Sequence, residues 1–329
     1  MFVSRPAPIV LIILVVVAIL LCAIVAGFYW ATGPSLRCHR PTEGPAEPGW
    51  SARIVASGGR DRCYYLYTPP QYDPGQPLPL VFSLHGFMSN PNSHALITKW
   101  HKLAKEEGFL LVYPQGTEYP QRWDAGETWG VSDTDDVQFY HDMLADVASL
   151  ASVDESRIYV NGFSNGGGMT VDLGCKAADT FAAMGTVSAA VVATEDCAPD
   201  RPMPAIVFHG TADPIVPYEG GEMGGWLLRQ AARATNAPPA FAGVEDWVAY
   251  WAESNGCDLT PRPFREQGDA RGIHYSECGA NAEVILYTIE DGGHSWPGGF
   301  PIPGVGKTSR DIDATEEMWK FFQMHTLGE

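Results

Sequence analysis

Residues 157–168, RIYVNGFSNGGG, carry the strongest fold signal in the chain. The apolar, β-branched run Arg157–Asn161 predicts a buried strand, and the small residues after it begin a helix predicted over Asn165–Lys176. Gly-x-Ser-x-Gly, centred on Ser164, lies between the two. In this strand–turn–helix context the pattern indicates a sharp turn that presents a serine hydroxyl at the end of a sheet. The stretch therefore predicts an α/β fold with Ser164 as a nucleophile.

Short apolar runs alternate with helical patterns on both sides of this stretch. Seven further strands are predicted, over Arg53–Ala56, Tyr64–Tyr67, Leu80–His85, Phe109–Tyr113, Ala183–Val187, Ala205–His209 and Val284–Ile289. Four further helices are predicted, over Ser93–Glu107, Asp133–Ala151, Val244–Ser254 and Ile312–His325. This alternation indicates a mainly parallel sheet with helices on both faces, and an antiparallel start where no helix separates the first two strands. Pro214–Ala242, rich in Gly, Pro and Ala, predicts an excursion over the sheet rather than a second domain.

A serine hydroxyl is a weak nucleophile, so it needs a base, and the base needs an acid that orients it. Asp213 follows the strand predicted over Ala205–His209, and His294 follows the strand predicted over Val284–Ile289. The carboxyl ends of parallel strands share one edge of a sheet, where functional sites gather. We therefore expect Ser164, His294 and Asp213 to form a nucleophile–base–acid triad, in a chain order that such triads are known to use.

Other side chains compete for these roles. His85 and His209 lie at strand ends but precede the position expected for the base, so we expect structural roles for them. Asp291 is expected to shape the loop that carries the base. Asp135 and Asp136 begin a predicted helix, where carboxylates cap the helix and interact with its dipole.

A tetrahedral oxyanion needs two backbone N–H donors. The residue after the serine, Asn165, is the first candidate, and Phe87, which follows an early strand and Gly86, is the second. Trp296 follows the base by two residues and is expected to form a wall of the substrate pocket. For Trp123 core packing is the favoured interpretation.

The N-terminal segment is unlike the rest of the chain. Ile9–Ala31 is uncharged and spans 23 residues, about 35 Å as a helix, which exceeds a hydrocarbon core of about 30 Å. This length favours an uncleaved membrane anchor over a cleaved signal or a lipoprotein modified at Cys22. The flanking charges do not decide its orientation. The expected organisation is a signal or membrane anchor over 1–31, a Pro/Gly-rich linker over 32–50 and one catalytic domain over 51–329.

Six of the seven cysteines follow this segment: Cys38, Cys63, Cys175, Cys197, Cys257 and Cys278. An even number suits three disulfides in an oxidising compartment, and we favour pairing of sequential neighbours, 38–63, 175–197 and 257–278. Reduced thiols are the alternative. A zinc site is disfavoured because the sequence holds no Cys-x-x-Cys pattern.

The charge balance excludes one class of function. Acidic residues number 39 and basic residues 21, for a formal net charge of −18. A nucleic-acid-binding protein needs a basic face, so nucleic acid is not an expected partner. Hydrophobic residues make up 45% of the chain, enough for a folded core. The composition does not indicate an oligomeric state.

Four stretches resemble the secreted polyhydroxybutyrate depolymerase and feruloyl esterase family: Leu84-His85-Gly86, YVNGFSNGG over 159–167, HGTADPIVPY over 209–218 and GGHSWPG over 292–298. The resemblance extends over about residues 52–325. It implies an α/β-hydrolase fold, the triad Ser164, Asp213 and His294, and extracellular ester hydrolysis without metal or organic cofactor. It also implies cysteines at positions 175, 197, 257 and 278, whereas Cys38, Cys63 and the long N-terminal segment depart from the family pattern.

These observations predict an extracytoplasmic serine carboxylic-ester hydrolase that forms an acyl-enzyme. Expected substrates are polyester oligomers or feruloyl and acetyl esters, and contact with a membrane is expected only through the N-terminal segment. A serine peptidase of the prolyl-oligopeptidase type shares the triad order but usually has a large gating domain, for which this chain lacks the length. The other alternative is an inert cell-surface binding protein on a hydrolase fold.

Overall fold

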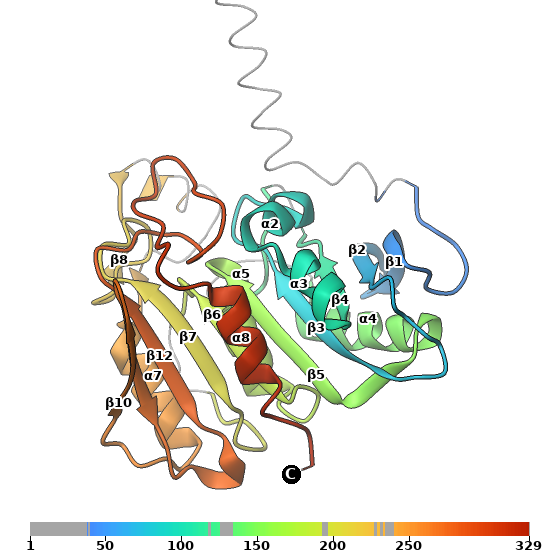
Figure 1. The fold of residues 1–329 in the computed structure, drawn as a ribbon. Helices are drawn as coiled ribbons and strands as arrows, with labels where there is room; N and C mark the ends of the chain where they lie inside the picture. Colours follow the sequence, from blue (N-terminus) through green and yellow to red (C-terminus); the bar gives the residue numbers. More distant parts are fainter. Residues whose placement is uncertain are drawn as a thin grey trace, which may run out of the picture.

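The computed structural model describes residues 38, 40–117, 120–125, 134–192, 197–226, 229–230, 233 and 240–328. Its central sheet contains the strands β1 Gly49–Ser57, β2 Arg60–Thr68, β3 Leu78–Leu84, β4 Leu110–Pro114, β5 Val153–Phe163, β6 Ala183–Val187, β7 Ala205–Gly210, β10 Arg262–Gln267, β11 Ala270–Tyr275 and β12 Val284–Ile289. They lie in the order β1-β2-β4-β3-β5-β6-β7-β12-β11-β10 (Figure 1).

The middle of the sheet is parallel and its margins are antiparallel. Neighbours from β4 through β3, β5, β6 and β7 to β12 pair in parallel. β2 pairs antiparallel with both β1 and β4, and β11 pairs antiparallel with both β12 and β10. The mainly parallel sheet and its antiparallel start confirm the predicted architecture.

The sequence pattern does not indicate the last two strands of the sheet, β11 and the edge strand β10. β10 has the sequence RPFREQ and is exposed along most of its length, so it lacks the apolar run that identified the central strands. β11 alternates buried and exposed positions only in part. Within the predicted excursion, β8 (Gly221–Glu222) pairs with β9 (Ala240–Phe241) as a separate two-stranded sheet.

Helices cover both faces of the sheet, as predicted (Figure 1). On one face lie α4 (Asp136–Leu150), α5 (Asn165–Lys176) and α7 (Val244–Ser254), whose buried side chains share a core with the strands. On the other face α3 (Trp100–Glu107) and α8 (Ala314–Phe322) build a second core. The helix predicted over Ser93–Glu107 is two helices, α2 (Pro91–Thr98) and α3, because Lys99 adopts a left-handed conformation with φ 59°. Its Nζ donates to the Gly298 carbonyl at 3.0 Å.

The chain before β1 is attached to the domain. Arg53 donates from its guanidinium to the carbonyls of Thr42 and Gly44 at 2.9 and 2.7 Å, and Ala46 is buried. The Ala46 N–H also donates to the Leu150 carbonyl at 2.9 Å. These contacts correct the predicted linker over 32–50: its C-terminal part packs on the domain, and β1 begins at Gly49 rather than at Arg53.

The predicted signal or anchor over Ile9–Ala31 lies outside the described residues. Within the described part of the chain, no helix combines the length and hydrophobicity that crossing a bilayer requires.

Three disulfides join Cys38 to Cys63, Cys175 to Cys197 and Cys257 to Cys278. All three pairings of sequential neighbours are confirmed. The first ties the chain before β1 to β2, and the second ties the end of α5 to the segment before β7. Such bonds fit an oxidising compartment.

Candidate active site

Ser164 lies at the sharp turn between β5 and α5. Its φ of 58° and ψ of −121° are strained for a residue with a side chain. A Cβ on Gly162 would lie 2.1 Å from the Gly166 carbonyl oxygen, and one on Gly166 would lie 2.4 Å from the His85 carbonyl oxygen. Both positions therefore require glycine, which explains the Gly-x-Ser-x-Gly pattern. The Ser164 N–H donates to the Val187 carbonyl of β6 at 3.0 Å, which fixes the turn to the sheet.

Asp213 follows β7, and both of its carboxylate oxygens accept hydrogen bonds. Oδ2 lies 2.8 Å from His294 Nδ1. Oδ1 accepts from the backbone N–H groups of Ile215 and Val216 at 2.8 and 2.9 Å. Burial raises the pKa of the Asp213 carboxyl, but His294 and these contacts hold it below its ordinary value. The carboxylate is therefore ionised and oriented toward the imidazole, as an acid that orients a base must be.

The loop after β12 carries His294 toward the serine turn. The Phe163 ring, one residue before Ser164, lies 4.8 Å from the His294 ring between centroids. Both Ser164 and His294 are almost fully buried, at 8% and 5% exposure. The structure thus joins His294 to Asp213 and places the His294 ring against Phe163, the residue before Ser164.

Trp296 occupies the core rather than an open wall of a pocket. Its side chain is fully buried, and its indole N–H donates to Thr315 Oγ1 at 2.9 Å. It also contacts Phe163 edge-on, at 6.3 Å between centroids. This placement corrects the expectation for Trp296: an offset of two residues from the base does not determine which side of the loop a side chain occupies.

His209, for which the sequence indicates no link to the site, lies against Asp213. Its Nε2 lies 2.9 Å from the Val216 carbonyl and 3.5 Å from Asp213 Oδ2. Burial lowers the pKa of His209, so the ring is neutral and donates from Nε2. These contacts place His209 against Asp213 and the loop that follows it. The position of His209 four residues before Asp213 was the available signal.

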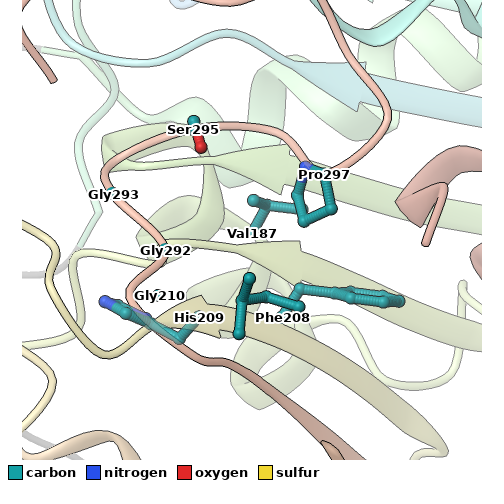
Figure 2. A pocket seen from close by; sticks show the side chains of 9 residues that line it. Val187, Phe208, His209, Gly210, Gly292, Gly293, Ser295 and Pro297 are labelled. Atoms are coloured by element: carbon teal, nitrogen blue, oxygen red, sulfur yellow. The ribbon is translucent and has the colours of Figure 1, made fainter. Parts of the chain in front are cut away.

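A small hollow lies beneath the loop that carries His294. Figure 2 shows Val187 and Phe208 on strands β6 and β7, with Pro297 on the loop above them. The lining includes neither Ser164 nor His294, so this hollow is not the place where a scissile bond would lie.

Asn165 and the segment that precedes Phe87 both adjoin Ser164. Asn165 is the first residue of α5, where the helix dipole favours negative charge. Gly86, next to Phe87, approaches so closely that a Cβ there would lie 3.1 Å from the Ser164 Cβ. Phe87 itself is half-buried and packs against the apolar cluster of Ala190, Val216, Met223 and Phe241.

Comparison with known proteins agrees with this architecture. Residues 62–219 match the family model described as Esterase PHB depolymerase. Feruloyl esterase C of Emericella nidulans is 30% identical over 293 residues, covering 86% of this chain and 93% of that protein. Feruloyl esterase B of Piromyces equi is 32% identical over 225 residues, which cover 66% of this chain; the chain spans only 39% of that relative's length.

Solved structures share the fold. The acetyl xylan esterase from Aspergillus awamori superposes with a TM-score of 0.53 at 16% identity, over 83% of this chain and 99% of that one. The fold and the relatives define a carboxylic-ester hydrolase of the α/β-hydrolase class. Within that class, the chain belongs to the family of polyhydroxybutyrate depolymerases and feruloyl esterases.

Proposed function

We propose that this protein hydrolyses carboxylic esters outside the cytoplasm through an acyl-enzyme on Ser164. His294 accepts the Ser164 proton as Oγ attacks the ester carbonyl, and the backbone N–H groups of Asn165 and Phe87 stabilise the tetrahedral oxyanion. His294 then protonates the leaving alkoxide. A water molecule, activated by the same imidazole, releases the acid and restores the serine.

The observation that carries this proposal is the 2.8 Å contact of His294 Nδ1 with Asp213 Oδ2 beside a serine held at φ 58°. The ionised carboxylate fixes the Nδ1–H tautomer, which leaves Nε2 free of a proton and able to accept one. The strained turn after β5 presents Ser164 at the same edge of the sheet as the loop that carries His294.

The proposed substrates are short polyester oligomers or feruloyl and acetyl esters. Relatives named feruloyl esterase and acetylxylan esterase support this class. The three disulfides support a location outside the cytoplasm. In this proposal the segment Ile9–Ala31 acts as the signal or anchor, as its length and hydrophobicity predict.

The proposal is tested with purified Ser164→Ala and a p-nitrophenyl acetate assay. We expect a loss of at least about 10³-fold in kcat, because removing the nucleophile leaves only binding and oxyanion stabilisation. Near-wild-type hydrolysis by the variant would refute the assignment. Comparing kcat/KM for feruloyl, acetyl-xylan and 3-hydroxybutyrate oligomer esters then identifies the substrate class.

A further inference from the structure

A short turn outside the triad touches both segments that carry the proposed oxyanion donors. We call it the 116–123 turn; its described residues are 116, 117 and 120–123. Thr117 and Arg122 close it with reciprocal backbone hydrogen bonds of 3.1 and 3.0 Å. At its end, the Trp123 side chain is fully buried. Core packing alone does not explain why the turn contacts both of these segments.

The turn is hydrogen-bonded to the Phe87 segment at three points. The Trp123 indole N–H donates to the His85 carbonyl at 2.7 Å. The Gly116 N–H donates to His85 Nε2 at 3.0 Å, and the Met88 N–H donates to the Gln121 carbonyl at 3.0 Å. These bonds hold the residues on both sides of Phe87, and so they restrict where the Phe87 N–H lies.

The same turn is bound to the other donor residue. The Asn165 side chain accepts from the Trp123 N–H through Oδ1 at 2.8 Å and donates to the Trp123 carbonyl through Nδ2 at 3.2 Å. Asn165 is fully buried, so both bonds form in a dry environment. The reciprocal pair fixes the first residue of α5 relative to Trp123.

The end of the 116–123 turn is also attached to helix α4 and strand β2. The backbone N–H of Asp124, the next residue, donates to Asp136 Oδ2 at 2.7 Å. Asp136 is buried at the start of α4 and pairs with Arg62 of β2 at 2.7 Å. Trp123 is therefore attached to α4 and β2 through Asp124 and Asp136, and it is bonded to both segments that carry the proposed oxyanion donors.

We propose that Trp123 is a positioning residue that sets the distance between the two oxyanion donors, an inference that rests on the proposed function. Its indole N–H fixes the Phe87 segment, and its backbone fixes Asn165. Two donors stabilise an oxyanion only when both lie at hydrogen-bond distance from it, and small displacements have large effects on rate. Trp123 acts through both donors and does not itself touch the substrate.

The test compares Trp123→Phe with Trp251→Phe. Trp251 is equally buried and also donates its indole N–H to a backbone carbonyl, that of Met203 at 2.9 Å, but it lies on α7 away from the site. Each variant is assayed for kcat and KM on p-nitrophenyl acetate. Inhibition is measured with an aryl trifluoromethyl ketone, which forms a hemiketal oxyanion on the serine, and melting temperature is recorded for both.

For Trp123→Phe we expect kcat to fall about tenfold or more, KM to stay within about twofold, and the ketone inhibition constant to rise by a factor similar to the fall in kcat. For Trp251→Phe we expect a lower melting temperature with kcat and ketone inhibition within about twofold of wild type. Unchanged kcat and inhibition in Trp123→Phe, or equal losses in both variants, would overturn the inference.

A second variant covers the case in which Trp123→Phe does not fold. Trp123→3-benzothienylalanine replaces the indole N–H by sulfur and keeps the size and shape of the ring. We expect the same selective loss of kcat and ketone affinity, and retention of both would refute the role. A wild-type enzyme without ester hydrolysis would instead refute the proposed function, so the two failures are distinguishable.

Discussion

Asp213 provides the sharpest prediction at the scale of one residue. In Asp213→Asn, Oδ1 still accepts from the Ile215 and Val216 N–H groups, so the loop keeps its shape. The new amide N–H then faces His294 Nδ1, which must become an acceptor. Nε2 consequently carries the proton and no longer accepts one from Ser164, so we expect kcat to fall by about 10³- to 10⁴-fold with little loss of stability.

The matched control for this change is Asp291→Asn, three residues before His294. Asp291 is exposed and has φ 54°, a conformation that asparagine adopts readily. We expect its kcat to equal that of the wild-type enzyme. Full activity of Asp213→Asn, or equal losses in both variants, would contradict the role given to Asp213.

The sequence predicted some of these residues and not others, for physical reasons. Gly-x-Ser-x-Gly and the two loops after strands predict roles for Ser164, Asp213 and His294, because a short motif and the end of a strand can be recognised within a few residues. The contacts of His209 and Trp123 depend on packing between distant segments, which no local pattern encodes. Trp296 was misplaced because loop conformation determines the direction of its side chain.

At the scale of an element, the β5–α5 turn depends on the absence of a side chain at Gly162. A Cβ there would lie 2.1 Å from the Gly166 carbonyl oxygen and 2.7 Å from Thr170 Oγ1. Gly162→Ala must displace the start of α5, so we expect a loss of at least about 2–3 kcal/mol in the free energy of unfolding by urea. Activity should fall as well, because Ser164 and Asn165 move with the helix.

Gly75→Ala is the control for this experiment. A Cβ on Gly75 would meet its nearest atom, Asp73 Oδ1, at an ordinary distance of 3.4 Å. We expect a change in stability within about 0.5 kcal/mol. If Gly162→Ala were as stable and as active as Gly75→Ala, the close packing described for the turn would be wrong.

The sequence predicts the buried helices and strands better than the exposed ones. Strands β3, β6 and β12 are buried along nearly all of their length, and the predicted ends agree with the observed ones within about two residues. The exposed strand β10 has no apolar run, and the break between α2 and α3 at Lys99 has neither glycine nor proline to indicate it. Tertiary contacts, such as that of Lys99 with Gly298, decide these features.

At the scale of the whole molecule, three buried histidines predict a loss of stability in mild acid. Burial lowers the pKa of His85 to about 4 and also lowers the pKa values of His94 and His209. In the unfolded chain these groups protonate below about pH 6.5, so the unfolded state binds more protons than the folded state. The stabilisation from these neutral rings is therefore fully present above about pH 6.5. It is lost as the pH drops toward the folded pKa values, by at most about 1.4 kcal/mol per pH unit for each histidine.

Urea unfolding between pH 5.0 and 7.5 measures this dependence. His94→Gln removes one of the three buried groups, and we expect the slope of unfolding free energy against pH to decrease below pH 6.5, by at most about 1.4 kcal/mol per unit. His141→Gln, at an exposed position, serves as the control for the substitution itself. A wild-type stability that is flat between pH 5.0 and 6.5 would contradict the burial described for these rings.

The proposed function depends above all on Ser164 being the nucleophile. The most direct test is labelling with a fluorophosphonate, followed by mass spectrometry of the digested protein. We predict one adduct per chain, on the peptide that contains Ser164, with hydrolysis of p-nitrophenyl acetate lost in parallel and no labelling of Ser164→Ala. A folded wild-type protein that hydrolyses the ester but is labelled at another residue, or not at all, would contradict the account.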